Sequence, residues 1–502
     1  MRIVSCVAII LLSMGGASRA CASAPQRAWV EYHQQQSAVP LRYEFQDQAA
    51  FDGGTRRRYT LHSQHWPDAA AANGSWSHRV EVLTPDHPQP GPALLVINNG
   101  IAGGGEGSST QAADDFPPEL LERLSRRLGM AVVSIADVPD QPRRVPGDDR
   151  ARLEDDLVAL TWRRFLDDPQ GAVHLPLHLP MAQAAVRAMD LAARELPAAL
   201  RPSFVVTGAS KRAWAAWLLP LVDDRVSHLV PFVMDMHWQA LAPHIRRTYG
   251  QRWPIALHPY WHHGITERIA DPAFAALMQG SDPYMYLSGP LRDRLGLPKY
   301  LVNASGDDFF TPDSTRFYLD ALPGATTLRM VPNTGHRGIR EHMASSLLPV
   351  LRRWRRGGSL PQVSTGWRAG TGGGTLQIRS SEMPVEAVLW TARNARDRDF
   401  RHACAIAYVP QALALADRDT WNVALEAPPE GWQASFVALR YSDGVVATTP
   451  VRVLPDPYFP SHPPSAGSGG CALVEEPPIK ESPVKGARIG DLLQAGALPS
   501  GR

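Results

Sequence analysis

Ser210 stands where a short apolar run turns into a helical pattern. Apolar residues dominate 203–207, Gly208 and Ala209 follow, and the helical pattern begins at Lys211. A serine in such a turn is lifted clear of the backbone, with its hydroxyl exposed at the end of a sheet. The backbone N–H after it, at a helix N-terminus, can stabilise an oxyanion. The pattern predicts a nucleophile elbow, although Arg212 stands where the usual Gly-x-Ser-x-Gly form has its second glycine.

The residues that would activate this serine follow in the order that catalysis needs. A predicted strand at 299–304 leads through Gly306 to a pair of aspartates, Asp307 and Asp308. A second predicted strand, at 326–331, leads to His336. A serine hydroxyl needs a base to take its proton, and the imidazole needs a carboxylate to fix its tautomer. The chain order Ser, Asp, His is that of α/β-hydrolases.

The sequence leaves three aspartates as candidates for the acid. We predict Asp308, because it lies further out along the loop, nearer Pro312, where it can turn back toward His336. Asp307 is the second candidate, since adjacent side chains point in different directions. Asp235, at the end of a predicted strand at 228–234, is the third.

An oxyanion hole needs two donors. The Lys211 N–H is the first, and a backbone N–H of Asn99 or Gly100 is the second, because these residues end the predicted strand at 93–98. The glycine cluster Gly103–Gly105 follows, and glycines let backbone N–H groups approach a ligand closely. The Lys211 ammonium has two interpretations: a group that binds a substrate carboxylate or the oxyanion, or a surface residue.

The elements that carry these residues alternate between strands and helices. This alternation predicts an α/β fold, a mostly parallel sheet with helices on both faces, over residues 28–356. The predicted strands are 93–98, 130–136, 203–207, 228–234, 299–304 and 326–331, with antiparallel edge strands near 57–63 and 78–84. The predicted helices are 117–128, 151–166, 180–196, 211–219, 312–321 and 339–355.

A cap insertion is predicted around 236–290. It is rich in aromatic residues, namely Trp238, Trp253, Tyr260 and Trp261, and in histidines, namely His258, His262 and His263. The aromatic rings either line a substrate site or pack the cap onto the core. The histidines lack a nearby pair of carboxylates, so we predict a structural role for them and no metal site. The triad chemistry implies no cofactor.

Length and composition place the chain among globular proteins. Its 502 residues exceed one compact core and predict two domains plus tails. A net charge of +2 gives no reason to expect a nucleic-acid partner. Short β-like runs over 363–455 predict a small C-terminal β-sandwich, and residues 456–502, rich in Pro, Gly and Ser, predict a disordered tail.

The N-terminus predicts export. Arg2 precedes an apolar run too short to span a bilayer, followed by small residues, so residues 1–22 read as a signal peptide cleaved after Ala20 or Ala22. We therefore expect a periplasmic or secreted protein with no membrane span. An oxidising compartment permits a bond between Cys404 and Cys471, and the sequence leaves their pairing open.

Several motifs together resemble the PhoPQ-activated pathogenicity-related proteins, an α/β-hydrolase-like family. The matching segments are 138–142, 154–162, 180–189, 208–212, 306–314, 331–336 and 398–401, and the resemblance spans roughly residues 28–455. It implies an exported α/β-hydrolase-like domain with a C-terminal β domain, and no particular substrate. Ala213 departs from the family pattern, which favours glycine there. The Gly-x-Ser-Lys form also resembles that of glucuronoyl esterases, in which a basic residue after the serine assists the oxyanion.

These observations predict an exported serine hydrolase that cleaves an ester or amide of a small molecule or glycan. Ser210 would attack the carbonyl, His336 would move the proton, and Asp308 would orient His336. The rival interpretation is a non-catalytic protein that uses the hydrolase scaffold to bind a polysaccharide or protein. The departure at Arg212 and Ala213 favours the rival; a complete triad disfavours it.

Overall fold

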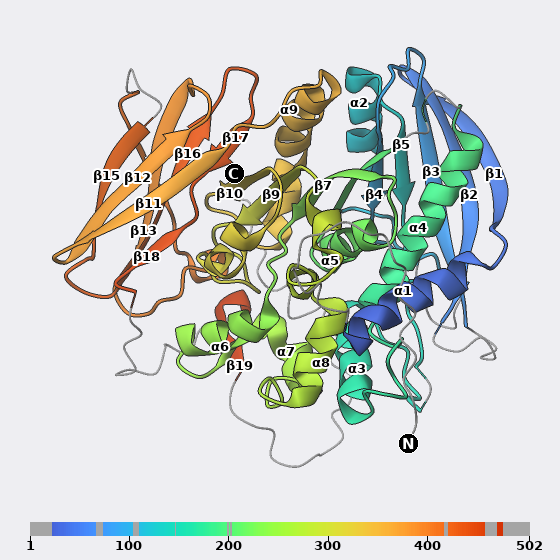
Figure 1. The fold of residues 1–502 in the computed structure, drawn as a ribbon, viewed down its shortest axis with the longest axis horizontal. Coiled ribbons are helices and arrows are strands. Elements are labelled where there is room, and N and C mark those ends of the chain that lie inside the picture. Colours follow the sequence, from blue (N-terminus) through green and yellow to red (C-terminus); the bar gives the residue numbers. More distant parts are fainter. Residues whose placement is uncertain are drawn as a thin grey trace, which may run out of the picture.

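A nine-stranded sheet forms the centre of the computed structural model, in the order β1-β2-β3-β5-β4-β6-β7-β9-β10 (Figure 1). The structure describes residues 23–66, 74–103, 110–145, 147–197, 200, 203–415, 420–456 and 469–474. Six strands form the parallel part: β4 (Ala93–Ile97), β5 (Val132–Ile135), β6 (Phe204–Ala209), β7 (Val226–Phe232), β9 (Lys299–Ala304) and β10 (Thr326–Val331). Each of them lies where the sequence predicts a strand.

Three antiparallel strands extend the sheet beyond β5. They are β1 (Arg42–Phe51), β2 (Gly54–His65) and β3 (Ser75–Pro85). The sequence predicts the centres of β2 and β3 but not β1. Most residues of β1 are exposed, so the strand lacks the apolar alternation that marks a buried sheet face. The helix α1 (Ala24–Ser37) is likewise absent from the prediction.

Helices cover both faces of the sheet (Figure 1). The helices α2 (Pro118–Leu128) and α9 (Met343–Arg355) pack on one face, and α1, α3 (Glu154–Asp167), α4 (His178–Glu195) and α5 (Lys211–Leu218) pack on the other. In α2, Leu120, Leu124 and Leu128 recur every four residues and are buried. Burying each leucine contributes roughly 2 kcal/mol. The predicted helix at 312–321 consists of two short 3-10 turns instead, Ser314–Phe317 and Leu319–Ala321.

The segment between β7 and β9 forms the predicted cap. Its helices are α6 (Trp238–Thr248), α7 (His258–His262) and α8 (Pro272–Ser281), and they gather below the sheet in Figure 1. The short strand β8 (Trp253–Pro254) lies between α6 and α7. Asp282 receives the backbone N–H groups of His237 and Trp238 and so caps the start of α6.

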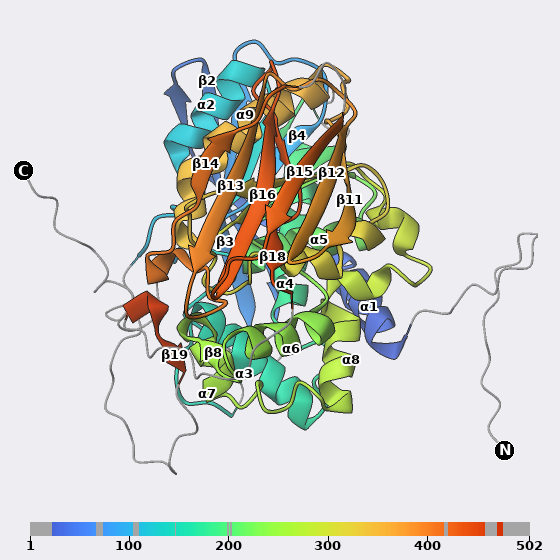
Figure 2. The same ribbon diagram turned by 90° about the vertical axis from the view of Figure 1, so that its left-hand side faces the viewer.

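Two small antiparallel sheets form the C-terminal domain (Figure 2). One has the order β11-β12-β15 and the other β14-β13-β16-β17, with β18 also paired to β16. Their bounds are β11 (Val363–Gly370), β12 (Gly373–Ser380), β13 (Glu386–Asn394), β14 (Val409–Ala412), β15 (Thr420–Glu426), β16 (Trp432–Arg440), β17 (Val446–Thr448) and β18 (Arg452–Leu454). Residues of both sheets share one buried core with α9, so the sandwich packs directly on the larger domain.

Part of the predicted disordered tail is ordered, which corrects the prediction there. Residues 469–474 form a 3-10 turn and the strand β19 (Leu473–Val474), which pairs with β8 in the cap. A disulfide joins Cys404 to Cys471 and ties this segment down. The predicted signal peptide and the remainder of the predicted tail, apart from Asp456, lie outside the described residues. No helix in the described ranges combines the length and apolarity that crossing a membrane requires.

Candidate active site

Ser210 occupies the turn between β6 and α5, as predicted. Its backbone has φ +56° and ψ −126°, a combination that residues with a side chain rarely adopt. The Ser210 N–H donates to the Phe232 carbonyl at 2.9 Å, which fixes the turn against β7. A side chain at Gly208 would clash, because a Cβ there would lie 2.8 Å from the Arg212 carbonyl oxygen. The strained backbone of Ser210 is of the kind that collects at functional turns.

Arg212 and Ala213 do not prevent the tight turn that the second glycine usually permits. The Ala213 methyl is fully buried, and the Arg212 guanidinium extends away to the Val138 carbonyl, with Nε at 2.6 Å. Gly208 lies close to the Arg212 backbone and so keeps the turn tight. The departure from the usual form therefore leaves the elbow conformation intact.

The structure pairs His336 with Asp307. The ring Nδ1 lies 2.8 Å from Asp307 Oδ2 and 3.0 Å from Oδ1. Oδ1 also accepts the backbone N–H groups of Phe309 and Phe310, at 2.7 and 3.2 Å, so the carboxylate is held in place. Burial lowers the pKa of His336, but the charge and hydrogen bond of Asp307 outweigh burial, and the pKa is raised.

The prediction that Asp308 orients His336 is therefore wrong. The second candidate, Asp307, bonds the imidazole instead. Asp308 instead accepts the backbone N–H of His336, and its Oδ1 is buried without a hydrogen-bond partner among the described residues. Burial, reinforced by the charge of Asp307, raises the pKa of Asp308 to about 6. The two carboxylates point in different directions, because the Phe309 and Phe310 N–H groups hold the Asp307 carboxylate beside the His336 ring.

Asp235, the third candidate, belongs to a separate buried network. Its Oδ1 accepts the Tyr318 hydroxyl at 2.5 Å and the Asn303 amide at 2.8 Å. Burial outweighs the two hydrogen bonds and, together with the charges of Asp307 and Asp313, raises the pKa of Asp235 to about 7. None of its hydrogen bonds within the described ranges reaches His336.

The other ring nitrogen of His336 is available for proton transfer. Nε2 is buried and has no hydrogen-bond partner among the described residues. The ring of Phe309 packs against the imidazole at 4.5 Å between centroids, and Phe310 lies at 6.2 Å. A neutral imidazole whose Nδ1–H points to a carboxylate presents Nε2 as a base.

The Lys211 ammonium is engaged and does not face an open site. It lies 2.8 Å from Glu154 Oε2 and 3.1 Å from Asp155 Oδ2, and the residue is only 8% exposed. Neither of the two predicted roles for the side chain fits. The ammonium is bonded to two carboxylates, so it is not free to bind a substrate or the oxyanion, and the residue is buried, so it is not a surface residue. The Lys211 backbone N–H remains a candidate oxyanion donor, because the first N–H groups of a helix have no partner within that helix.

The predicted second donor loop lies beside the elbow. Strand β4 runs parallel to β6 with Ile97 opposite Gly208, so residues 98–100 follow next to Ala209 and Ser210. The Asn99 N–H is taken by the Asn98 side chain at 3.1 Å, and the Asn99 amide bonds the 114–115 backbone. Gly100, at φ +127°, is the remaining candidate. Gly104 and Gly105 lie outside the described residues.

The cap aromatics pack rather than line an open wall. Trp238 stacks on Trp214 at 6.0 Å, and Trp253 is buried in β8 beside β19. The Tyr260 hydroxyl donates to Asp155 at 3.0 Å. His263 bonds Asp156 at 2.8 Å.

One group of three potential metal ligands comes together in the described part of the chain. It comprises Asp399, Cys404 and Cys471, and its two cysteines are bonded to each other. It therefore offers no thiolate ligands in this state.

Sequence reasoning missed the charged residues that brace the site. Glu154 receives both Lys211 and Arg212. On the other side, Asp313 is buried between Arg398 Nη2 at 2.7 Å and His244 Nε2 at 3.0 Å. The only sequence signal for Glu154, Asp313 and Arg398 was that they fall within the segments that resemble the family. Their roles could not be predicted, because their partners are distant in sequence.

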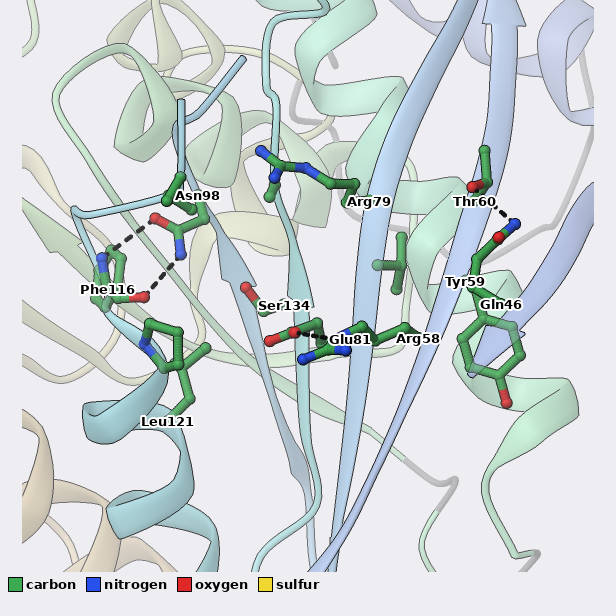
Figure 3. Close-up of a pocket in the computed structure, with 15 residues that line it drawn as sticks. Gln46, Arg58, Tyr59, Thr60, Arg79, Glu81, Asn98, Phe116, Leu121 and Ser134 are labelled. Atoms are coloured by element: carbon green, nitrogen blue, oxygen red, sulfur yellow. Dashed lines mark hydrogen bonds and ion pairs between the residues drawn. The ribbon is translucent and has the colours of Figure 1, made fainter. Parts of the chain in front are cut away.

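A separate cavity lies on the α2 side of the sheet and is not this site. Its volume is about 510 Å³, and Figure 3 shows residues from β1, β2, β3 and β5 around it. Polar groups there are paired: Arg58 bonds Glu81 at 3.1 Å, and the Asn98 amide bonds the Phe116 backbone. None of Ser210, Asp307 and His336 lines it.

The sheet order and the strained serine turn define an α/β-hydrolase-like protein. The family model described as PhoPQ-activated pathogenicity-related protein matches residues 30–401, and the chain belongs to this family. A curated relative, Autocrine proliferation repressor protein A of Dictyostelium discoideum, is 28% identical over 406 residues, which cover 76% of this chain and 79% of the relative.

Among solved structures, the chain is similar to two esterases. The acetyl xylan esterase from Paenibacillus sp. R4 has a TM-score of 0.46 and 15% identity, covering 67% of this chain and 95% of that one. The glucuronoyl esterase from Solibacter usitatus has a TM-score of 0.37 and 13% identity, covering 59% of this chain and 82% of that one.

Proposed function

We propose that this protein is an exported serine esterase with the triad Ser210, His336 and Asp307. The observation that carries the proposal is that one sheet presents a strained, partly exposed serine and a histidine whose Nδ1 is held by a carboxylate and whose Nε2 has no partner among the described residues. These groups lie on loops after three parallel strands of one sheet, β6, β9 and β10, with β7 between β6 and β9. The substrate is an ester, or an amide, of a small molecule or glycan.

In the proposed reaction, Ser210 Oγ attacks the carbonyl carbon while His336 Nε2 takes the hydroxyl proton. Asp307 keeps the other ring proton on Nδ1 and stabilises the imidazolium that forms. The oxyanion is held by the Lys211 N–H and the Gly100 N–H. The imidazolium then returns its proton to the leaving group, which yields an acyl-enzyme, and water repeats the sequence to release the acid.

The disulfide supports the proposed export. Bonds such as Cys404–Cys471 persist in oxidising compartments and are rare in the cytosol. We propose that residues 1–22 direct the chain to the periplasm or outside the cell.

The relative's name favours a second candidate function. That name speaks of repressing proliferation and not of hydrolysis, and a hydrolase scaffold that binds a polysaccharide or a protein would need no working nucleophile. If this second candidate is correct, the protein keeps the arrangement of the triad residues but does not catalyse hydrolysis.

Covalent labelling separates the two candidates. Purified mature protein is treated with a fluorophosphonate, and peptide mass spectrometry locates the adduct. The esterase requires an adduct on Ser210 that is lost in Ser210→Ala and falls at least about 1,000-fold in rate in His336→Ala. No adduct in protein shown to be folded by circular dichroism would reject the esterase in favour of the binding scaffold.

A further inference from the structure

Glu154 has a conformation and a set of contacts that the triad alone does not explain. It begins α3 with φ +47°, a backbone region that glutamate seldom adopts. Its N–H donates to Gln141 Oε1 at 2.8 Å, and Gln141 Nε2 returns a bond to Glu154 Oε1 at 2.6 Å. This two-way bond holds the strained residue in place, and such strain collects at functional sites.

The Glu154 carboxylate receives both cations that follow the nucleophile. Lys211 Nζ lies 2.8 Å from Oε2, and Arg212 Nη2 lies 2.7 Å from Oε1. Burial raises the pKa of Glu154, but the charges of Arg212 and Lys211 outweigh burial and hold that pKa well below its usual range. The carboxylate is therefore ionised at neutral pH and fixes the first turn of α5 directly behind Ser210.

The Lys211 charge also acts on the base. It lowers the pKa of His336, whereas Asp307 and Asp308 raise it. The charged and titratable groups that face Lys211 are Glu154 and Asp155 from α3, Arg212 from α5, and His178 from α4. An uncompensated Lys211 would disfavour the imidazolium that the proposed reaction forms.

We propose that Glu154 is a positioning residue: it holds Lys211 and Arg212 behind Ser210 and offsets the Lys211 charge, so that His336 can act as the base. The proposal rests on the proposed function, because positioning matters only if Ser210 reacts. It also removes Lys211 from the set of side chains that bind substrate.

The test is an NMR titration of the His336 ring in the intact protein, which needs no substrate. In Glu154→Gln, one negative charge is lost beside Lys211, and the His336 titration midpoint should fall by roughly half a pH unit or more. In Lys211→Met the midpoint should rise, and the double variant should return toward the wild-type value. Asp156→Asn, on the same turn of α3 but paired with Arg152 and His263, is the matched control and should leave the midpoint unchanged.

Unmoved midpoints in both Glu154→Gln and Lys211→Met would overturn the proposal. If Glu154→Gln fails to fold, Lys211→Met alone decides: a higher midpoint supports the coupling, and an unchanged one rejects it. Fluorophosphonate labelling of the wild-type protein is run in parallel. A shifted midpoint with no label on Ser210 would reject the esterase while leaving the electrostatic coupling established.

Discussion

The two sides of the candidate active site are held by different means. On the nucleophile side, the conformation of Ser210 comes from adjacent residues, the strand β6, Gly208 and the first turn of α5. On the base side, the loop that carries Asp307 depends on distant segments. The Gly306 carbonyl accepts the His402 N–H at 2.9 Å, and the Gly306 N–H donates to Thr334 at 3.0 Å. Adjacent residues thus set the conformation of the serine turn, which Phe232 and Glu154 then hold in place, whereas the acid loop takes its position from long-range contacts.

The C-terminal segment extends this long-range support. Arg401 donates to the carbonyls of Gly470, Cys471 and Ala472 at 3.2, 2.8 and 3.1 Å. The disulfide joins the turn at 402–404 to the same segment, and β19 continues it into the cap. Residues about 70 positions apart in the sequence therefore meet beneath the acid loop.

The sharpest test of the base side compares the two adjacent aspartates. Asp307→Asn should lower the rate of Ser210 phosphonylation by about 1,000- to 10,000-fold, because an amide there stabilises the wrong imidazole tautomer. Asp308→Asn should lower it by less than about 10-fold, since Asp308 accepts the His336 backbone N–H while Asp307 holds the ring. Stopped-time labelling with mass spectrometry measures both rates. Equal losses in the two variants would refute the assignment of Asp307.

This pair of aspartates also marks the limit of prediction from sequence. Strand positions, the serine turn and His336 follow from apolar runs, Gly208 and chain order, all of which are local patterns. The prediction of Asp308 over Asp307 failed because the direction of the carboxylate depends on the Phe309 and Phe310 N–H groups and on the neighbouring loops. The role of Lys211 was missed for a different reason: its partners, Glu154 and Asp155, lie more than 50 residues away in the sequence.

Loss of the disulfide should weaken the base side more than the nucleophile side. Because the two cysteines are 67 positions apart, replacing both Cys404 and Cys471 by serine should lower the free energy of unfolding by about 4 kcal/mol. Urea unfolding monitored by tryptophan fluorescence measures the change. Added dithiothreitol should destabilise the wild-type protein and leave the double variant unaffected. Equal stability of the two proteins without reductant would argue against the support that we assign to residues 469–474.

The nucleophile side can be broken at Gly208. An added methyl would lie 2.8 Å from the Arg212 carbonyl, so Gly208→Ala should cost about 1–3 kcal/mol of stability and slow labelling of Ser210. Gly357→Ala is the control for steric clash. No atom lies within 4 Å of a Cβ at that position, although its positive φ adds some backbone strain. Thermal unfolding and labelling rates are compared for both. A Gly208→Ala protein that labels at the wild-type rate would show that the elbow tolerates the methyl.

The smallest predicted effect is a shift in pH dependence. His336 must be neutral to accept the serine proton, and pairing with Asp307 raises its pKa. Labelling of the wild-type protein should therefore rise with pH, with a midpoint above the ordinary histidine value of about 6.5. The midpoint should fall in Asp307→Asn, because the charge that stabilises the imidazolium is gone. A wild-type midpoint below about 6 would contradict the pairing.

The most direct measurement is a crystal structure of the protein after reaction with a dialkyl phosphoryl fluoride. The account predicts phosphorus bonded to Ser210 Oγ, a phosphoryl oxygen accepting the Lys211 N–H, and His336 Nε2 within hydrogen-bond distance of Oγ. Asp307 should still hold His336 Nδ1. An unmodified Ser210, or a phosphoryl group on another residue with His336 turned away, would contradict the assignment of this triad.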